Sequence, residues 1–156
     1  MSSHIVDRED GQSKRTLHLR IPPDPVFART VRDAIIGFGS LHGIDEADLE
    51  ALLFAVGEAL ANAIEHSASG DDIEILAEID DRRVVATVID RGRGLSIAPP
   101  QLAPLPSGLA ERGRGIPIMQ RCTDIFNIKS TPGKGTAITL GRWRKTYENA
   151  GRADAS

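Results

Sequence analysis

Apolar residues recur along this chain with two different periods. Alternation of apolar and polar positions predicts five strands, and recurrence every three to four residues predicts three helices. The predicted strands are residues 15–21, 73–79, 84–89, 124–130 and 136–143. The predicted helices run from Asp24 to the stretch 37–43, from Asp45 to Ser67, and from Ile116 to Arg121. Asp24, followed by Pro25, and Asp45 are the predicted N-caps of the first two helices. This order predicts an α/β two-layer sandwich, with helices on one face of a mixed, largely antiparallel sheet.

The segments around these elements are polar or rich in glycine and proline. Residues 1–14 lack apolar periodicity and are predicted to be a flexible N-terminal tail, and residues 143–156 a polar C-terminal tail. The remaining residues, 15–142, are enough for one domain. Residues 91–114 show no periodicity and are rich in Gly and Pro. A loop of this length in a compact domain is usually functional, so we predict a mobile lid.

Composition and charge limit the cellular compartment and the kinds of partner that we expect. A net charge of -3 offers no basic excess to neutralise a nucleic-acid backbone, so nucleic acid is not expected as a partner. The single cysteine, Cys122, provides neither an internal disulfide nor a metal framework. No apolar run is long enough to cross a membrane, and the N-terminus does not resemble a signal peptide. We therefore expect no membrane association and a cytoplasmic location.

A carboxylate and an amide lie one turn apart inside the second predicted helix. Glu58 and Asn62 fall on its polar side, opposite an apolar stripe. For a lone Glu-x-x-x-Asn pair, a solvated helix face is the common explanation. The alternative is that the Asn62 amide oxygen binds Mg²⁺, which prefers oxygen ligands, while Glu58 deprotonates a hydroxyl or a water. His66 by itself is explained as a residue near the negative end of the helix dipole.

Three glycine motifs follow in the second half of the chain. Asp90-Arg-Gly-Arg-Gly94 ends a predicted strand and is either a turn or a carboxylate that accepts a hydrogen bond from an exocyclic amine. Arg112-Gly-Arg-Gly115 precedes a helix and is either a flexible basic loop or a phosphate site of arginines and free backbone N–H groups. Gly133-Lys-Gly-Thr136 is the least specific, because a hairpin turn also explains it.

Together and in this order, these motifs resemble those of the GHKL ATPase superfamily. Residues 58–66 resemble its N box, and the three glycine motifs resemble its successive glycine boxes. The resemblance extends over residues 15–142. Within the superfamily, the short chain and the phrase Val-Gly-Glu-Ala-Leu-Ala-Asn-Ala-Ile-Glu-His at 56–66 are most similar to bacterial anti-sigma-factor serine/threonine kinases of the partner-switching type.

The resemblance implies a role for each matched residue. Glu58 would be the general base for the acceptor serine, and Asn62 would bind Mg²⁺ between the phosphates. His66, in the same box, would contribute to the nucleotide site, and Asp90 would accept a hydrogen bond from the adenine amine. The other implied nucleotide-binding residues are Gly92, Gly94 and Thr136 around the adenine, and Arg112, Gly113, Arg114 and Gly115 at the phosphates.

The implied function is that of an ATP- and Mg²⁺-dependent serine/threonine protein kinase that is also an anti-sigma factor. Such a protein would phosphorylate a small antagonist of STAS type and sequester a sigma factor, and whether it forms a homodimer is left open. One alternative is a nucleotide-binding regulatory module without kinase turnover. A detached histidine-kinase catalytic domain is less favoured, because the sequence shows no helical phosphoacceptor segment with a histidine.

Overall fold

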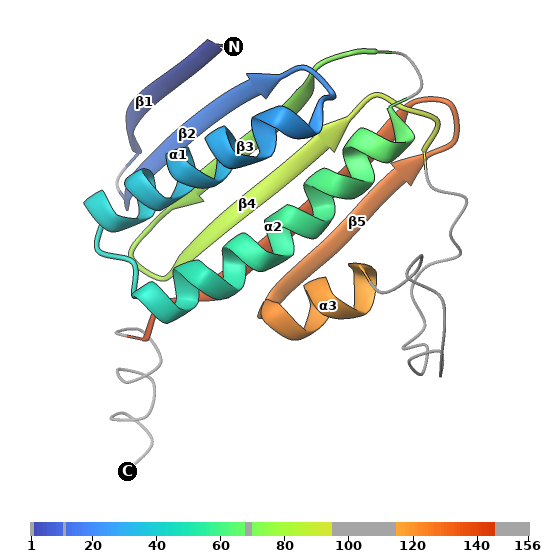
Figure 1. Ribbon diagram of the computed structural model, residues 1–156. Coiled ribbons are helices and arrows are strands. Elements are labelled where there is room, and N and C mark those ends of the chain that lie inside the picture. The colour runs from blue at the N-terminus through green and yellow to red at the C-terminus, as the bar shows by residue number, and fades with distance from the viewer. Residues whose placement is uncertain (1, 11, 68–69, 95–114, 146–156) are drawn as a thin grey trace.

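The structure, a computed structural model, describes residues 2–10, 12–67, 70–94 and 115–145. In these residues six strands form one sheet in the order β1-β2-β3-β4-β6-β5, and the helices cover one of its faces (Figure 1). The strands are β1 (Ser2–Asp10), β2 (Gln12–Ile21), β3 (Ile73–Ile79), β4 (Arg83–Asp90), β5 (Ile125–Thr131) and β6 (Gly135–Trp143). The helices are the 3₁₀ turn η1 (Pro25–Phe27), α1 (Ala28–Leu41), α2 (Glu46–His66) and α3 (Gly115–Cys122). The predicted two-layer sandwich is confirmed.

Two expectations about the sheet were wrong. Residues 2–10, predicted as part of a flexible tail, form β1, which pairs with β2 from Ser2 opposite Arg20 to Asp10 opposite Gln12. Backbone pairing requires no apolar periodicity, and the free edge of β2 offers a row of N–H and C=O groups to any adjacent segment. The sheet is also not mixed, because every described pairing is antiparallel. The reason is that β5 and β6 form a hairpin whose second strand returns antiparallel beside β4.

Both predicted N-caps are present. The Asp24 carboxylate accepts a hydrogen bond from Val26 N at 2.9 Å, and Pro25 occupies the first position of η1, which leads into α1. The Asp45 carboxylate accepts one from Ala47 N at 3.0 Å at the start of α2. These bonds satisfy donors that have no partner inside the helix, so they fix where each helix begins.

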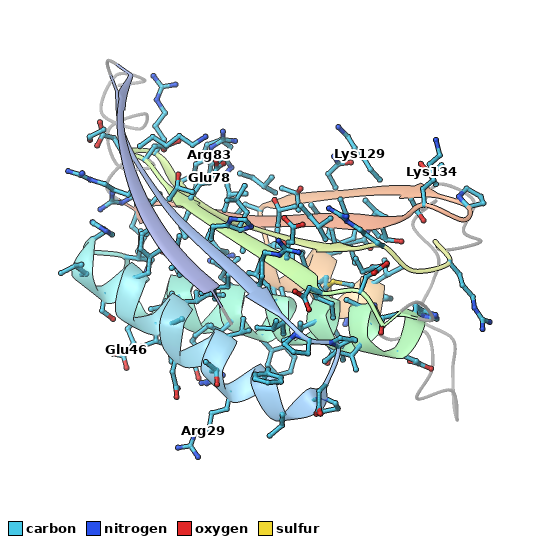
Figure 2. The ribbon with its side chains drawn as sticks, turned by 90° about the horizontal axis from the view of Figure 1, so that it is seen from above. Arg29, Glu46, Glu78, Arg83, Lys129 and Lys134 are labelled. Atoms are coloured by element: carbon cyan, nitrogen blue, oxygen red, sulfur yellow. The ribbon has the colours of Figure 1, made fainter. Side chains whose placement is uncertain are left out.

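The core lies between the helices and one face of the sheet. Strand β3 alternates between buried and half-buried positions along its whole length, which gives the sheet one apolar face. Helix α2 crosses the middle of this face between α1 and α3 (Figure 1). Leu52 of α2 and Met119 of α3 are fully buried, each contributing about 1.5–3 kcal/mol relative to an exposed side chain. Figure 2 shows charged residues on both outer surfaces, with Glu46 on the helical side and Lys129 on the other.

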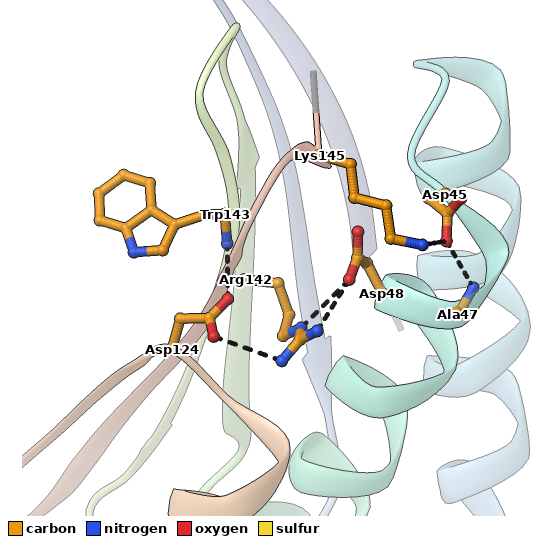
Figure 3. Close-up of polar contacts among 7 residues, drawn as sticks. All are labelled: Asp45, Ala47, Asp48, Asp124, Arg142, Trp143 and Lys145. Atoms are coloured by element: carbon orange, nitrogen blue, oxygen red, sulfur yellow. Dashed lines mark hydrogen bonds and ion pairs between the residues drawn. The ribbon is translucent and has the colours of Figure 1, made fainter. Parts of the chain in front are cut away.

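A buried ion pair joins the start of α2 to the sheet (Figure 3). The Arg142 guanidinium of β6 donates from Nη2 to Asp48 Oδ1 at 2.9 Å and from Nε at 3.3 Å. Its Nη1 is 3.4 Å from Asp124 Oδ1, and Asp124 Oδ2 accepts a hydrogen bond from Trp143 N at 2.9 Å. Asp48 is only 3% exposed, so its charge depends on this guanidinium for compensation.

The end of the described chain is also anchored. Lys145 Nζ lies 2.9 Å from Asp45 Oδ1. The hydrogen bond from Lys145 lowers the pKa of Asp45 below its usual 3.8, and Asp45 raises the pKa of Lys145 above 10.5. Both groups are therefore charged at neutral pH. The predicted C-terminal tail, 143–156, thus begins with three residues that are tied to the domain, and residues 146–156 lie outside the described part.

We predict that Arg142→Ala lowers the free energy of unfolding by about 3–5 kcal/mol, because it leaves the buried Asp48 carboxylate without its cation. Urea unfolding would measure the loss. The double variant Asp48→Ala/Arg142→Ala removes the stranded charge and should be less destabilised than Arg142→Ala alone. Equal stability of the single and double variants would contradict a coupled buried pair.

Candidate nucleotide site

The carboxylate–amide pair of α2 faces the first residue of α3. A Cβ added at Gly115 would lie 3.3 Å from Glu58 Oε2 and 3.4 Å from Asn62 Nδ2. Glu58 and Asn62 are both half-buried, one turn apart on the side of α2 that meets α3. The pair is therefore partly covered by α3 rather than standing on a helix face open to solvent on all sides. Since Gly115 has no side chain, the two polar groups stay accessible beside the N-terminus of α3.

The predicted adenine carboxylate is buried at the end of β4. Asp90 is 7% exposed, and its Oδ1 accepts a hydrogen bond from Gly92 N at 2.9 Å. The register of β4 and β6 places Asp90 directly opposite Thr136, which is also buried. Thr136 Oγ1 lies 3.0 Å from Ser130 Oγ on the neighbouring strand. A buried acceptor and two hydroxyl groups thus converge where β4, β5 and β6 end or begin.

Close backbone contacts hold this corner together. A Cβ on Gly92 would overlap the carbonyl oxygen of His66, and one on Gly135 would overlap the carbonyl oxygen of Asp90. Gly94 has φ 75°, and a Cβ there would lie 2.6 Å from Thr131 O. Glycine is therefore required at these positions for steric reasons. The loop after β4 is pressed against both the end of α2 and the β5–β6 turn.

The structure brings most of the predicted site residues into two adjoining groups. One group is Glu58, Asn62 and Gly115. The other is Asp90, Gly92, Gly94 and Thr136, with the backbone of His66 resting on Gly92. Helix α2 connects the groups, because His66 follows Asn62 by one turn. The predicted phosphate residues Arg112, Gly113 and Arg114, and residues 95–114 of the predicted lid, lie outside the described residues.

Sequence reasoning missed two residues of the site. Ser130 was assigned only to a strand, yet its hydroxyl contacts Thr136. Gly135 has φ 111° and stands against Asp90, although only its motif had been noted. Gly135 could have been found, because a glycine in a hairpin turn that faces an aspartate at the end of a strand predicts a close approach of the two backbones. Nothing in the sequence marks Ser130.

The donor set limits how a metal ion could bind. Within the described residues there is no cluster of three or more His, Cys, Asp or Glu side chains. A divalent cation beside Asn62 would therefore rely on the amide oxygen, a neighbouring carboxylate and oxygens of a ligand, an arrangement that Mg²⁺ tolerates better than other common cations. No helix in the described part of the chain is long and apolar enough to span a membrane.

We predict that Gly92→Ala destabilises the fold by about 1–3 kcal/mol, because its Cβ would overlap the His66 carbonyl and force the loop away from α2. The matched control is Gly37→Ala in α1, where a Cβ would have no described atom within 4 Å. The control should gain about 0.5–1 kcal/mol from helix propensity. Urea unfolding of both variants checks this, and similar stabilities would contradict the contact.

Comparisons with known proteins agree with this geometry. Residues 21–142 match the model of the histidine kinase-like ATPase domain. An anti-sigma F factor of Caldanaerobacter subterraneus is 31% identical over 122 residues, which cover 75% of this chain and 83% of that protein. A serine-protein kinase RsbW of Bacillus velezensis is 28% identical over 148 residues, covering 88% and 89% of the two chains.

A solved structure shows the same fold. The crystal structure of the RsbU and RsbW domains of Rv1364c from Mycobacterium tuberculosis superposes with a TM-score of 0.65 at 25% identity. The match covers 83% of this chain and 33% of that one, so the chain spans about a third of that protein. The family model extends from the last residue of β2 almost to the end of β6 and includes every described site residue. The chain therefore belongs to the family of histidine kinase-like ATPase domains.

Proposed function

We propose that this chain is an ATP-dependent serine/threonine protein kinase and anti-sigma factor. It phosphorylates a small antagonist protein of STAS type and sequesters a sigma factor in the cytoplasm. The observation that carries the proposal is the Glu58–Asn62 pair against Gly115, one helical turn from the buried Asp90 corner. The names of the relatives, an anti-sigma F factor and a serine-protein kinase, support the same function.

The described residues fit a purine nucleotide. Asp90 is a buried carboxylate with one oxygen on Gly92 N, and an ionised carboxylate can only accept hydrogen bonds, which suits an exocyclic amine. The Thr136 hydroxyl lies across the sheet from it. At the other end, Gly115 lies close to Glu58 and Asn62 without a side chain to cover them, and the N-terminus of α3 there favours anions. Because the Asp90 corner and the Gly115 end lie at different positions along α2, the nucleotide would lie with its base at Asp90 and its phosphates at Gly115.

The chemistry requires positioning more than covalent participation by the protein. Glu58 accepts the proton of the acceptor hydroxyl, whose oxygen forms a bond to the γ-phosphorus as the bond to the bridging oxygen of ADP breaks. Asn62 is the residue that would hold Mg²⁺, whose charge would neutralise the phosphates. The N-terminus of α3 directs its free N–H groups at the phosphate oxygens. The burial of Asp90 excludes water from the adenine contact.

Asp90→Asn should weaken ATP and ADP binding by about 10-fold or more, because the amide presents donors as well as an acceptor towards the amine. Isothermal titration calorimetry with ATP and Mg²⁺ measures this. Circular dichroism confirms that the fold is retained. An unchanged dissociation constant would remove Asp90 from the nucleotide site.

Glu58→Gln should retain nucleotide affinity and slow phosphoryl transfer by roughly 10²–10⁴-fold, the usual contribution of a general base. The measurement is transfer of label from γ-labelled ATP to a serine of the antagonist. The matched control is Glu78→Gln, the same change on the sheet face away from the helices (Figure 2). Rates within a few-fold of wild type for both variants would leave a nucleotide-binding module without turnover as the better description.

A further inference from the structure

The outer face of α2 carries a partly apolar strip next to Glu58. Phe54 is 57% exposed, one of four large hydrophobic side chains exposed in the described residues, and Gly57 and Ala61 are exposed as well. Gly57 follows Phe54 by three residues and Ala61 follows Gly57 by four, so the three share one face of the helix. We call Phe54, Gly57 and Ala61 the α2 strip. It places one protruding aromatic ring beside a surface that has almost no side chains.

The packing of the described residues does not explain Gly57. It lies in the interior of a 21-residue helix, where glycine costs about 1 kcal/mol relative to alanine. Among the described residues, a Cβ at this position would meet nothing within 4 Å, whereas one on Gly39 of α1 would lie 2.7 Å from Leu49 Cδ1. Gly39 is thus explained by helix packing and Gly57 is not. A bare helix surface permits close approach of another backbone, which is the use of small residues at interfaces between helices.

The position of the strip beside Glu58 indicates which kind of partner would cover it. Phe54 and Ala61 lie one turn before and one turn after Glu58, so all three are surface neighbours. If Glu58 is the base of the proposed kinase reaction, the protein that delivers the acceptor hydroxyl must touch this part of α2. A specific interface buries about 800 Å² on each partner, far more than Glu58 and its immediate surroundings provide. An acceptor protein that reaches Glu58 therefore needs further contact surface, and the strip is exposed surface directly adjacent to Glu58.

The surface next to the strip is also suited to a protein. A pocket of about 410 Å³ opens between α1 and α2, with an apolar floor that includes Leu49 and Leu53. Its α2 rim carries Glu46 and Glu50, and Glu50 lies one turn before Phe54. Aromatic side chains are enriched at protein interfaces, and a hollow with an apolar floor and a charged rim next to Phe54 offers further contact area to a protein partner.

We infer that the α2 strip is the docking surface for the acceptor protein, with Phe54 as its anchor and with Gly57 and Ala61 admitting the partner's backbone close to Glu58. This inference rests on the proposed function, since it takes the occupant to be the protein whose serine is phosphorylated. It assigns substrate recognition to residues outside the candidate nucleotide site.

The test uses three variants with matched controls. Phe54→Ala is paired with Leu41→Ala, another exposed apolar side chain, at 76% exposure. Ala61→Leu is paired with Ala47→Leu, which lies on the same face of α2 two heptads earlier. Gly57→Leu is paired with Gly37→Leu, since a Cβ at either glycine has no neighbour within 4 Å in the described part of the chain. All substitutions except those to alanine add a good helix former at an exposed site, so the fold is retained.

Steady-state kinetics with purified STAS-type antagonist and labelled ATP separate binding from chemistry. The three strip variants should raise the KM for the antagonist about 10-fold or more, with the KM for ATP and kcat at saturating antagonist within about 3-fold of wild type. The controls should leave all three constants unchanged. Gly57→Leu should in addition raise the thermal unfolding midpoint by about 2–4 °C, so a higher KM cannot be attributed to a weakened fold.

Failure of the inference and failure of the proposed function are distinguishable. If wild type phosphorylates the antagonist and the strip variants keep its KM, the docking surface lies elsewhere and the kinase assignment stands. If the strip variants and their controls raise KM equally, the effect is not local and the inference is wrong. If wild type binds ATP but transfers no phosphate to any antagonist, the kinase function and the docking surface fall together.

Discussion

The position of α2 against the sheet is the constraint on which the candidate site depends. Glu58 and Asn62 can form a site only if α2 keeps them at a fixed distance from the end of β4 and the start of α3. Contacts near both ends of the helix fix this position. Near its start, Arg142 ties Asp48 to β6. Near its end, the carbonyl of His66 rests directly on Gly92. Small side chains on the buried face allow close packing in between, namely Ala55, Ala59 and Ala63.

The elements that sequence reasoning predicted are those whose signal is local. The caps at Asp24 and Asp45 involve residues within two positions of each other, so a short window of sequence contains both partners. Strand β3 alternates without exception, and α2 carries a continuous apolar stripe. For the candidate site, the order of the motifs led to the prediction of Glu58, Asn62 and Asp90, and the structure places each of them on the type of element predicted for it.

The features that sequence reasoning missed depend on contacts between distant segments. Strand β1 forms because β2 leaves an edge free, and its own residues show no apolar pattern. The approach of Gly115 to Glu58 depends on how α3 packs on α2, and the pairing of Thr136 with Asp90 depends on the register of β4 and β6. Neither is encoded in any single stretch. The same holds for Ser130, whose hydroxyl has a role only because two strands place it beside Thr136.

Strand β2 shows that recognisable similarity and the folding unit have different boundaries. The family match begins at residue 21, yet the preceding residues of β2 supply Leu17 and Leu19 to the core and pair with β3 along its entire length. A protein trimmed to the matched residues would lose this strand and present the isoleucine-rich β3 as a bare edge, a template for aggregation. Expression of the domain for biochemical work should therefore begin before β2 rather than at the start of the family match.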